Sequence, residues 1–331
     1  MKVGSPLKSR VTPKAVRRLA ALSLIAGAVT SLAQVDIPDG EALPALSVIP
    51  VQGNVYMIPG AGGNIAVQIG DDGVLVVDTG LAENAGRVLN AIRSLTDKPV
   101  RFVVNTHLHP DHTGGNETIG AAGISEGFRD SLRTEPIIPI YAHEAVLHRL
   151  SGVIEDPFGV PFRAWPLDTY HVDKFDMYFN GESIQLRHQP NAHTDGDSIV
   201  YFRRSDVIVT GDIYLTTSYP FIDVARGGSL QGIIDALNEL LELMIPDRNE
   251  EGGTLAISGH GAISDEYEVV NYRDMLTIIR DRVVAYIGMG MTLEEIKAAQ
   301  PTYDYDGRYG IDTPLWSTEQ FIETIYREFA E

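Results

Sequence analysis

Short runs of apolar residues, separated by turn-forming residues, recur along the middle of the chain and predict a series of short β-strands. The segments between the first three runs, residues 59–63 and 70–73, are rich in glycine, which accepts the left-handed backbone conformation of tight turns. The predicted strands cover residues 54–58, 64–69, 74–78, 100–104, 139–142, 183–188, 198–203, 207–210 and 254–258.

Helical periodicity separates several of these strands. Residues 84–95 place apolar side chains at positions 85, 88, 89, 92 and 95, which form one face of a helix. Segments 143–150 and 230–243 predict two further helices. The pattern turns helical from Asp265 onward and includes a capping box at Thr292–Glu295. Strands and helices therefore alternate in two halves, and each sheet needs a helical layer on one face.

These patterns divide the chain into an arm at residues 34–50, an α/β domain at 51–264 and a helical C-terminal extension at 265–331. Residues 120–135 contain few apolar residues and predict a surface loop. Residues 151–168 are rich in proline, glycine and aromatic residues. This second segment is predicted either to cover the mouth of a functional site or to pack against the body of the domain.

Residues 1–33 have the composition of a secretory signal. Basic residues without any acidic residue precede a short apolar stretch at 19–32, and Ser31 and Ala33 are small residues at the positions that precede a cleavage site. We expect cleavage after Ala33 and export, which in a bacterium with two membranes places the protein in the periplasm. The alternative is a membrane anchor. No other segment of the sequence approaches the ~18 consecutive apolar residues of a membrane span.

Composition and charge narrow the class of function. The 331 residues are 44% hydrophobic and 21% charged, which is ordinary for a globular protein, and they include no cysteine. Any metal site must therefore use nitrogen and oxygen ligands. The net charge is 26 − 45 = −19, and without the six basic residues of the leader it is 20 − 45 = −25. Such a surface repels nucleic acid and anionic lipid, so we expect neither as a partner of the mature protein.

One stretch, Asn105 to Gly115, carries the densest candidate chemistry. His107, His109, Asp111 and His112 follow directly after the predicted strand at 100–104. The first two lie on one side of an extended backbone because side chains alternate with period 2. The last two are adjacent in sequence and point in different directions, which suits two neighbouring metal ions better than one. Imidazole and carboxylate are ligands that suit zinc.

Three later positions share a local design, in which a polar residue stands at a strand end beside glycine or another small residue. They are His193 in Ala-His-Thr-Asp-Gly-Asp, Asp212 in Thr-Gly-Asp and His260 in Gly-His-Gly. Strand ends in a packed α/β body are where sites are commonly built. His188, at the end of its own strand, is the one competitor for the role of His193. The remaining histidines stand in no such context; they are His143, His148 and His171.

Together these motifs resemble the metallo-β-lactamase superfamily, in the family's order, from about residue 54 to residue 262. The matching features are His-Leu-His-Pro-Asp-His at 107–112, the three motifs at 193, 212 and 260, and Asp-Thr-Gly at 78–80. The resemblance implies a four-layer αβ/βα sandwich of two facing sheets, with two metal ions at one edge, followed here by the helical C-terminal extension.

The resemblance also implies the ligand set. His107, His109 and His193 would hold a first zinc ion. A second zinc ion would be held by Asp111, His112 and His260, and Asp212 would bridge the two ions. Asp78 matches an acid behind the ligands, as expected for an acceptor that orients imidazole N–H groups.

Departures from the family pattern narrow the activity. Zinc β-lactamases usually carry cysteine or serine at or near the place of Asp212, so this chain looks more like the lactonases and thioesterases of the superfamily. His109 stands where di-iron members carry glutamate, which disfavours an oxygen-reducing enzyme. The tail from Asp265 resembles the helical extension of exported metallohydrolases.

The sequence thus predicts a dinuclear zinc hydrolase of small molecules, in which metal-bound hydroxide attacks the carbonyl of an ester, lactone, thioester or β-lactam. Asp111 is predicted to accept the proton of the attacking water. Tyr214 either donates to the substrate oxygen or packs as a strand-end tyrosine. The alternatives are a β-lactamase proper and a non-catalytic protein that uses zinc for stability. The sequence makes no prediction of oligomeric state.

Overall fold

The strands assemble into two sheets whose buried faces follow the apolar pattern of the sequence. The computed structural model describes residues 44–123, 137–154, 156–246 and 252–330. The predicted leader, residues 34–43 of the predicted arm and residues 124–135 of the predicted loop lie outside these residues. Residues 45–331 form one compact unit.

The first sheet has seven strands in the order β1-β2-β3-β4-β5-β6-β7, mostly antiparallel at its start and parallel from β4 onward. Its strands are β1 (Ile49–Gln52), β2 (Val55–Ile58), β3 (Ile65–Gly70), β4 (Gly73–Val77), β5 (Val100–Val104), β6 (Ile140–His143) and β7 (Asp168–Tyr170). Ile49 and Pro50, which were predicted to end the arm, instead belong to β1.

The second sheet has six strands in the order β13-β12-β11-β10-β9-β8. Its strands are β8 (Lys174–Phe179), β9 (Glu182–Gln189), β10 (Asp197–Phe202), β11 (Val207–Val209), β12 (Leu255–Ile257) and β13 (Ile263–Ser264). The pairing of β11 with β12 is parallel, and the others are antiparallel.

The helices follow the predicted pattern closely. They are α1 (Ala85–Leu95), α2 (Pro110–Thr113), α3 (Asn116–Ala122), α4 (Glu144–Leu150), α5 (Leu230–Leu243), α6 (Glu266–Gly288), α7 (Leu293–Ala298), α8 (Tyr303–Tyr309) and α9 (Thr318–Ala330). The capping box at Thr292 and Glu295 is present at the start of α7. Residues 120–122, predicted as the start of a loop, instead continue α3, because Ile119 is buried against the first sheet.

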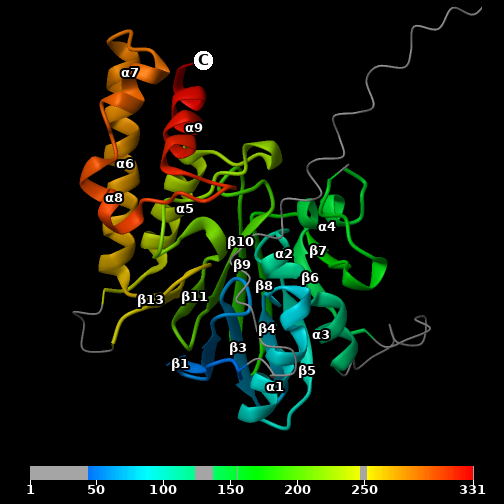
Figure 1. The fold of residues 1–331 in the computed structure, drawn as a ribbon. Helices are drawn as coiled ribbons and strands as arrows, with labels where there is room; N and C mark the ends of the chain where they lie inside the picture. The colour runs from blue at the N-terminus through cyan, green and yellow to red at the C-terminus, as the bar shows by residue number, and fades with distance from the viewer. Residues whose placement is uncertain (1–43, 124–136, 155, 247–251, 331) are drawn as a thin grey trace, which may run out of the picture. The chain divides into compact units, whose positions relative to one another are not determined.

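Alternation along the strands builds the four layers. In β4, Leu75 and Val77 point between the sheets, while Val74 and Val76 pack against α1 and α3. In β10, residues 200 and 202 point between the sheets, and residues 199 and 201 pack toward α5 and α6. Strands β4 and β10 therefore bury both faces, and the layers run helix, sheet, sheet, helix (Figure 1).

The C-terminal extension shares a core with the body. Helices α5, α6 and α9 lie side by side (Figure 1). Tyr272 and Leu276 of α6 pack in one cluster with Leu237 of α5 and Phe321 of α9. No helix among the described residues is long and apolar enough to cross a membrane.

Candidate metal centre

The predicted ligand segment emerges from the parallel edge of the first sheet. Strand β5 ends at Val104, the chain bends at residues 106–108, and Pro110 then starts α2. The rings of His107 and His109 lie close together, with centroids 4.9 Å apart, whereas Leu108 between them is buried in an apolar cluster. The two imidazoles are therefore neighbours, as predicted, although the backbone between them is bent and not extended.

A first group of three imidazoles contains His107, His109 and His193, whose ligand atoms lie within 4.8 Å of one another. His109 Nδ1 and His193 Nε2 face each other at 2.8 Å. Their outer nitrogens are already occupied. His109 Nε2 lies 2.9 Å from Asp223 Oδ2, and His193 Nδ1 lies 2.7 Å from the carbonyl oxygen of Phe221. With the outer nitrogens held by acceptors, both inner nitrogens are available to one cation between them.

A second group contains Asp111, His112 and His260. His260 Nε2 lies 3.1 Å and His112 Nε2 lies 3.7 Å from Asp111 Oδ2. Asp212 stands between the two groups. Its Oδ1 lies 3.2 Å from His112 Nε2, and its Oδ2 lies 3.9 Å from His193 Nε2. The structure thus brings all seven predicted ligands together, with Asp212 at the place expected of a bridge.

Buried atoms without partners indicate what the site accommodates. His107 Nε2, His112 Nε2 and Asp212 Oδ1 are buried and have no hydrogen-bond partner among the described residues, because the 3.2 Å approach of the last two lacks hydrogen-bond geometry. Leaving polar atoms buried and unpaired is costly, and coordination bonds would satisfy all three. The donors are imidazole nitrogens and carboxylate oxygens, which fit zinc or a similar divalent cation.

The electrostatics of the site also favour cations. Burial opposes protonation of His112, yet the carboxylates of Asp212, Asp111 and Asp78 raise its pKa well above the ordinary value. Burial likewise opposes ionisation of Asp212, but His260 and His112 bring the pKa of this carboxyl well below its usual range. Negative potential is therefore concentrated where the nitrogens converge, and such a potential attracts metal ions.

Asp78 orients two parts of the ligand segment from the end of β4. Its carboxylate accepts from Thr106 N at 2.8 Å, from Thr106 Oγ1 at 2.7 Å and from His112 Nδ1 at 2.7 Å. The residue adopts φ 62°, a left-handed conformation that is uncommon outside glycine and more accessible to aspartate than to most residues. This carboxylate lies behind His112, as the family resemblance implied.

The loop that carries His260 is tied to the first sheet. Asn64 donates its backbone N–H to Gly259 O at 2.8 Å and its side-chain amide to Ser258 O at 2.9 Å. Gly259 also donates to the carbonyl of Tyr214 at 3.1 Å. These bonds join the ends of the two sheets beside the metal ligands.

Gly259→Ala is expected to displace the bridging carboxylate. A Cβ at this position would overlap Asp212 Oδ1 and the carbonyl oxygen of Gly211. Because the backbone cannot move freely, the carboxylate would have to shift, and a misplacement of about 1 Å can cost roughly 100-fold in rate. Steady-state kinetics and metal content test this. Gly307→Ala in α8, where a Cβ meets nothing within 4 Å, is the matched control. Equal activity of the two variants would contradict the prediction.

Tyr214 packs in the core, which is one of the two alternatives that the sequence left open. Its side chain is buried, its hydroxyl donates to Ser264 Oγ at 2.8 Å, and its ring packs edge-on against Tyr272. Burial raises the pKa of Tyr214 to about 12, so the phenol is neutral near pH 7. The hydroxyl is therefore already bonded within the core.

Tyr214→Phe is accordingly expected to leave kcat/KM within about threefold of wild type while lowering the free energy of unfolding by roughly 1 kcal/mol, the net worth of one buried hydrogen bond. Kinetics together with urea denaturation test both parts. A tenfold fall in kcat at unchanged zinc content would instead restore a catalytic role for the hydroxyl.

Sequence reasoning missed a set of residues behind His109. Asp223 accepts from His109 and from Arg226 Nη1, the latter at 2.6 Å. Arg226 also bonds Asp156 and lies over the ring of Phe158, 4.4 Å from its centroid. Arg226 lies three residues after Asp223 in a 3-10 turn, but no local pattern links this turn to residues 107–112.

The segment at 151–168 satisfies both of its predicted alternatives. Val160 and Trp165 pack against the body beside Leu108. Phe158 meanwhile lies edge-on to His109, with ring centroids 5.5 Å apart. The segment is therefore packed on the domain and also borders the candidate centre.

The competing histidine does not join the ligand groups. His188 stacks on His143 with ring centroids 3.5 Å apart, and its Nε2 lies 2.9 Å from the carbonyl oxygen of Asp195. The ligand groups found among the described residues contain His193 instead. The sequence-based preference for His193 over His188 therefore agrees with the geometry.

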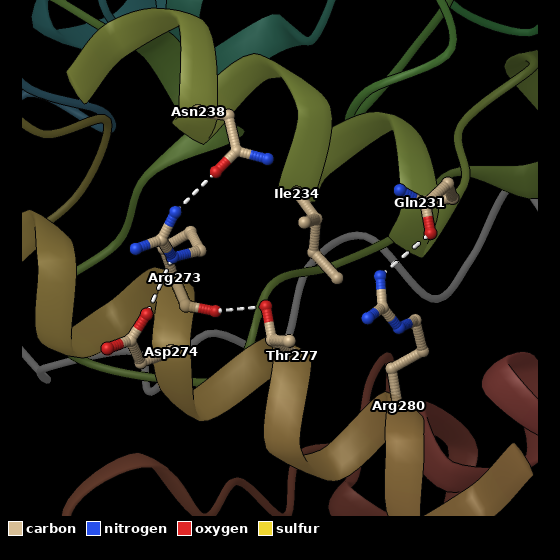
Figure 2. Close-up of a pocket in the computed structure, with 7 residues that line it drawn as sticks. All are labelled: Gln231, Ile234, Asn238, Arg273, Asp274, Thr277 and Arg280. Atoms are coloured by element: carbon tan, nitrogen blue, oxygen red, sulfur yellow. Dashed lines mark hydrogen bonds and ion pairs between the residues drawn. The ribbon is translucent and has the colours of Figure 1, made fainter. Parts of the chain in front are cut away.

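A groove of about 250 Å³ lies apart from these ligands, between α5 and α6 (Figure 2). Its two guanidinium groups are already engaged: Arg273 bonds Asn238 and Asp274, and Arg280 bonds Gln231 and Asp281. The pairing neutralises much of the positive charge of the groove, so the candidate chemistry remains with the metal ligands.

Two curated relatives share part of their sequence with this chain. A linear primary-alkylsulfatase from Pseudomonas sp. is 23% identical over 266 residues, which are 68% of this chain and 47% of the relative. The alpha subunit of a 2,4-dinitroanisole O-demethylase from Nocardioides sp. is 26% identical over 187 residues, which are 54% of this chain and 51% of the relative. The chain thus spans about half the length of these relatives.

Solved structures show the same fold. The inverting sec-alkylsulfatase Pisa1 from Pseudomonas sp. matches with a TM-score of 0.60 at 16% identity, covering 86% of this chain and 50% of Pisa1. A metallo-β-lactamase from Pontibacter korlensis matches with a TM-score of 0.52 at 17% identity, covering 70% of this chain and 99% of that protein.

A family model described as the metallo-β-lactamase superfamily matches residues 50–260, a range that contains all seven converging ligands. Fold, ligand groups and family model agree, and the expected αβ/βα sandwich is confirmed. The chain belongs to the metallo-β-lactamase superfamily.

Proposed function

We propose that this protein binds two zinc ions and hydrolyses sulfate esters of aliphatic alcohols. The observation that carries the proposal is the convergence of seven imidazole and carboxylate side chains into interlocking ligand groups. A structural zinc needs four ligands and no open position, whereas this set is larger and suits a dinuclear catalytic centre. The expected ligands are His107, His109 and His193 for one ion, Asp111, His112 and His260 for the other, and Asp212 for both.

Zinc ions bound there would supply Lewis acidity and would lower the pKa of a coordinated water toward ~7. The chain's own residues prepare this chemistry. Asp223 and the carbonyl of Phe221 hold His109 and His193 with their inner nitrogens toward the first position. Asp78 does the same for His112. Asp111, whose side chain is 30% exposed, is the ligand placed to take a proton from the attacking water and pass it to solvent.

Charge balance supports an anionic substrate group. The carboxylates of Asp111, Asp212 and Asp78 contribute three negative charges at the centre, against the four positive charges of two divalent ions before a hydroxide binds. The centre would therefore carry a net positive charge within a chain whose formal net charge is −19. A sulfate ester, which bears one negative charge, is attracted to such a centre and would be repelled by the rest of the surface.

The comparisons support the same substrate class. The alkylsulfatase relative covers 68% of this chain, and the alkylsulfatase structure covers 86%, against 70% for the Pontibacter β-lactamase. Esters with a carbonyl group, which the sequence alone favoured, and β-lactams are the competing substrates. Asp212 disfavours a β-lactamase proper, as the family pattern implied.

A substrate panel tests the proposal on the full chain loaded with zinc. We expect sulfate release from octyl sulfate, loss of this activity on chelation and its return with zinc, together with two zinc ions per chain by elemental analysis. Turnover limited to an aryl carboxylic ester, a homoserine lactone or a cephalosporin would overturn the sulfate assignment. One tightly held zinc ion with no hydrolysis would favour the non-catalytic alternative instead.

We further propose that the protein is exported after cleavage behind Ala33, on the composition of residues 1–33. Intact mass of the protein recovered from a periplasmic extract tests this. A mature chain beginning at Gln34 is expected, and a full-length chain confined to membranes would favour the anchor alternative.

A further inference from the structure

We infer that Phe158, Phe221 and Trp316 determine substrate specificity by forming an apolar wall beside the first metal position, which receives the aliphatic chain of the ester. The inference rests on the proposed function, because it concerns the part of the substrate that does not react. It assigns a role to the C-terminal extension, since Trp316 lies just before α9.

The wall lies directly against two predicted ligands. The ring of Phe158 is edge-on to His109, with centroids 5.5 Å apart and an interplanar angle of 89°. The ring of Phe221 lies 6.0 Å from that of His109 and 5.8 Å from that of His193. Trp316 packs edge-on against Phe221 at 5.0 Å. Two rings therefore pack against His109 or His193, and the third ring packs against one of these two rings.

Phe158 and Phe221 are each tied to another part of the chain. The guanidinium group of Arg226 lies over the ring of Phe158. Ion pairs with Asp156 at 2.7 Å and with Asp223 at 2.6 Å hold this guanidinium group in place. Phe221 is tied to the centre through its own carbonyl, the acceptor for His193 Nδ1. A wall fixed in this way can orient a substrate without the entropic cost of ordering loose side chains.

The wall is partly open to solvent, and exposed apolar residues lie near each of its rings in sequence. All three rings are only half-buried. Exposed apolar side chains lie one to four residues from each ring in sequence: Ile154 and Phe162 near Phe158, Val224 near Phe221, and Leu315 beside Trp316. Exposed apolar surface beside a charged centre is typical of a ligand site.

The polar and apolar parts of the site are complementary to an amphiphilic anion. The head group would face the converging ligands, where the net charge is positive with zinc bound, while the chain would lie on the rings. Each methylene that leaves water for such a surface should increase kcat/KM about two- to fourfold, until the wall ends.

Kinetics with n-alkyl sulfates of four, six, eight and ten carbons, used below their micelle-forming concentrations, test the inference. Phe221→Ala and Trp316→Ala are expected to lower the ratio of kcat/KM for decyl sulfate to kcat/KM for butyl sulfate roughly tenfold or more. The control is Tyr303→Ala, which removes an exposed aromatic ring of the same extension and should change neither value. Circular dichroism and zinc content verify that each variant is folded, and Trp316→Leu replaces Trp316→Ala if the latter is not.

Binding of non-hydrolysable n-alkyl sulfonates by calorimetry separates the inference from the proposed function. If wild type cleaves alkyl sulfates but both wall variants keep its chain-length dependence, the inference is overturned and the proposed function stands. If wild type cleaves no sulfate ester, yet binds sulfonates more tightly as the chain lengthens and loses this trend in the variants, the wall stands and the proposed function fails. Loss of the trend in Tyr303→Ala alone would also overturn the inference.

Discussion

Asp212→Asn is expected to lower ester hydrolysis by about 1,000-fold or more and to reduce the zinc content to one ion per chain. The carboxylate approaches both groups: Oδ1 lies 3.2 Å from His112 Nε2, and Oδ2 lies 3.9 Å from His193 Nε2. Asparagine keeps the shape but replaces an anionic oxygen with an NH2 group, which repels a cation. Loss of a charge that stabilises the reacting centre typically costs 100- to 1,000-fold, and loss of one ion adds to that.

The measurement is kcat/KM for the best ester of the wild type, with elemental analysis of the same sample. Asp97→Asn is the matched control, because it makes the same charge change at an exposed position between α1 and β5. The assignment of Asp212 as the bridge would be wrong if Asp212→Asn kept two zinc ions and more than a tenth of the activity.

Asp78→Ala is expected to have the largest effect on stability, roughly 3–5 kcal/mol of the free energy of unfolding. Truncation leaves three buried donors without an acceptor, namely Thr106 N, Thr106 Oγ1 and His112 Nδ1. Each unsatisfied buried group costs about 1–3 kcal/mol. Alanine also tolerates the φ of 62° less well than aspartate, so the backbone offers no compensating gain.

Asp78→Asn separates this structural effect from the effect on the metal. Asparagine retains one carbonyl oxygen and the tolerance of a positive φ, so much of the fold should persist. His112 loses the carboxylate that orients its ring. Substitution of the residue that accepts a hydrogen bond from a metal-ligating histidine typically reduces metal affinity 10- to 100-fold. Urea denaturation and competition for zinc measure the two effects. A zinc affinity equal to wild type in Asp78→Asn would show that Asp78 serves the backbone alone.

The two predictions share one physical cause, the negative potential of the carboxylates at the centre. Burial disfavours every charged group in the pocket, yet the neighbouring carboxylates raise the pKa of His112 against that effect. Removing either Asp78 or Asp212 reduces the negative potential that favours a cation. Removal of Asp212 acts through its direct contact with the ion. Removal of Asp78 acts through His112, the imidazole that binds the ion.

The sequence by itself determined the layers of the fold. Period-2 alternation in β4 and β10 and the helical face of α1 are local properties, because each follows from which side chains can share one buried face. Short strands with a weaker pattern were missed. In β8, Phe175, Met177 and Phe179 alternate with exposed polar residues and Tyr178. This strand therefore has the period-2 pattern of a strand, although the sequence analysis did not predict it.

The ligand set could also be predicted from the sequence, because its motifs are local. Four of the seven ligands occupy six consecutive positions, and the others stand in glycine-flanked strand ends that match a known family. Such motifs can be recognised in a sequence because the backbone lies close to the site residues, which restricts the residue types that fit beside them. Gly259, where a side chain would overlap Asp212, is an instance.

Only the tertiary structure decided which distant residues surround those ligands. Asp223 lies 114 positions from His109, and Trp316 reaches Phe221 from the far end of the chain. Their residue types are ordinary for a turn and for a helix entrance, so nothing local distinguishes them. Tyr214 is a similar case, since its hydroxyl faces Ser264, and that choice follows from the packing of α6 against the second sheet. Contacts of this kind depend on how whole layers meet, which no short stretch of sequence specifies.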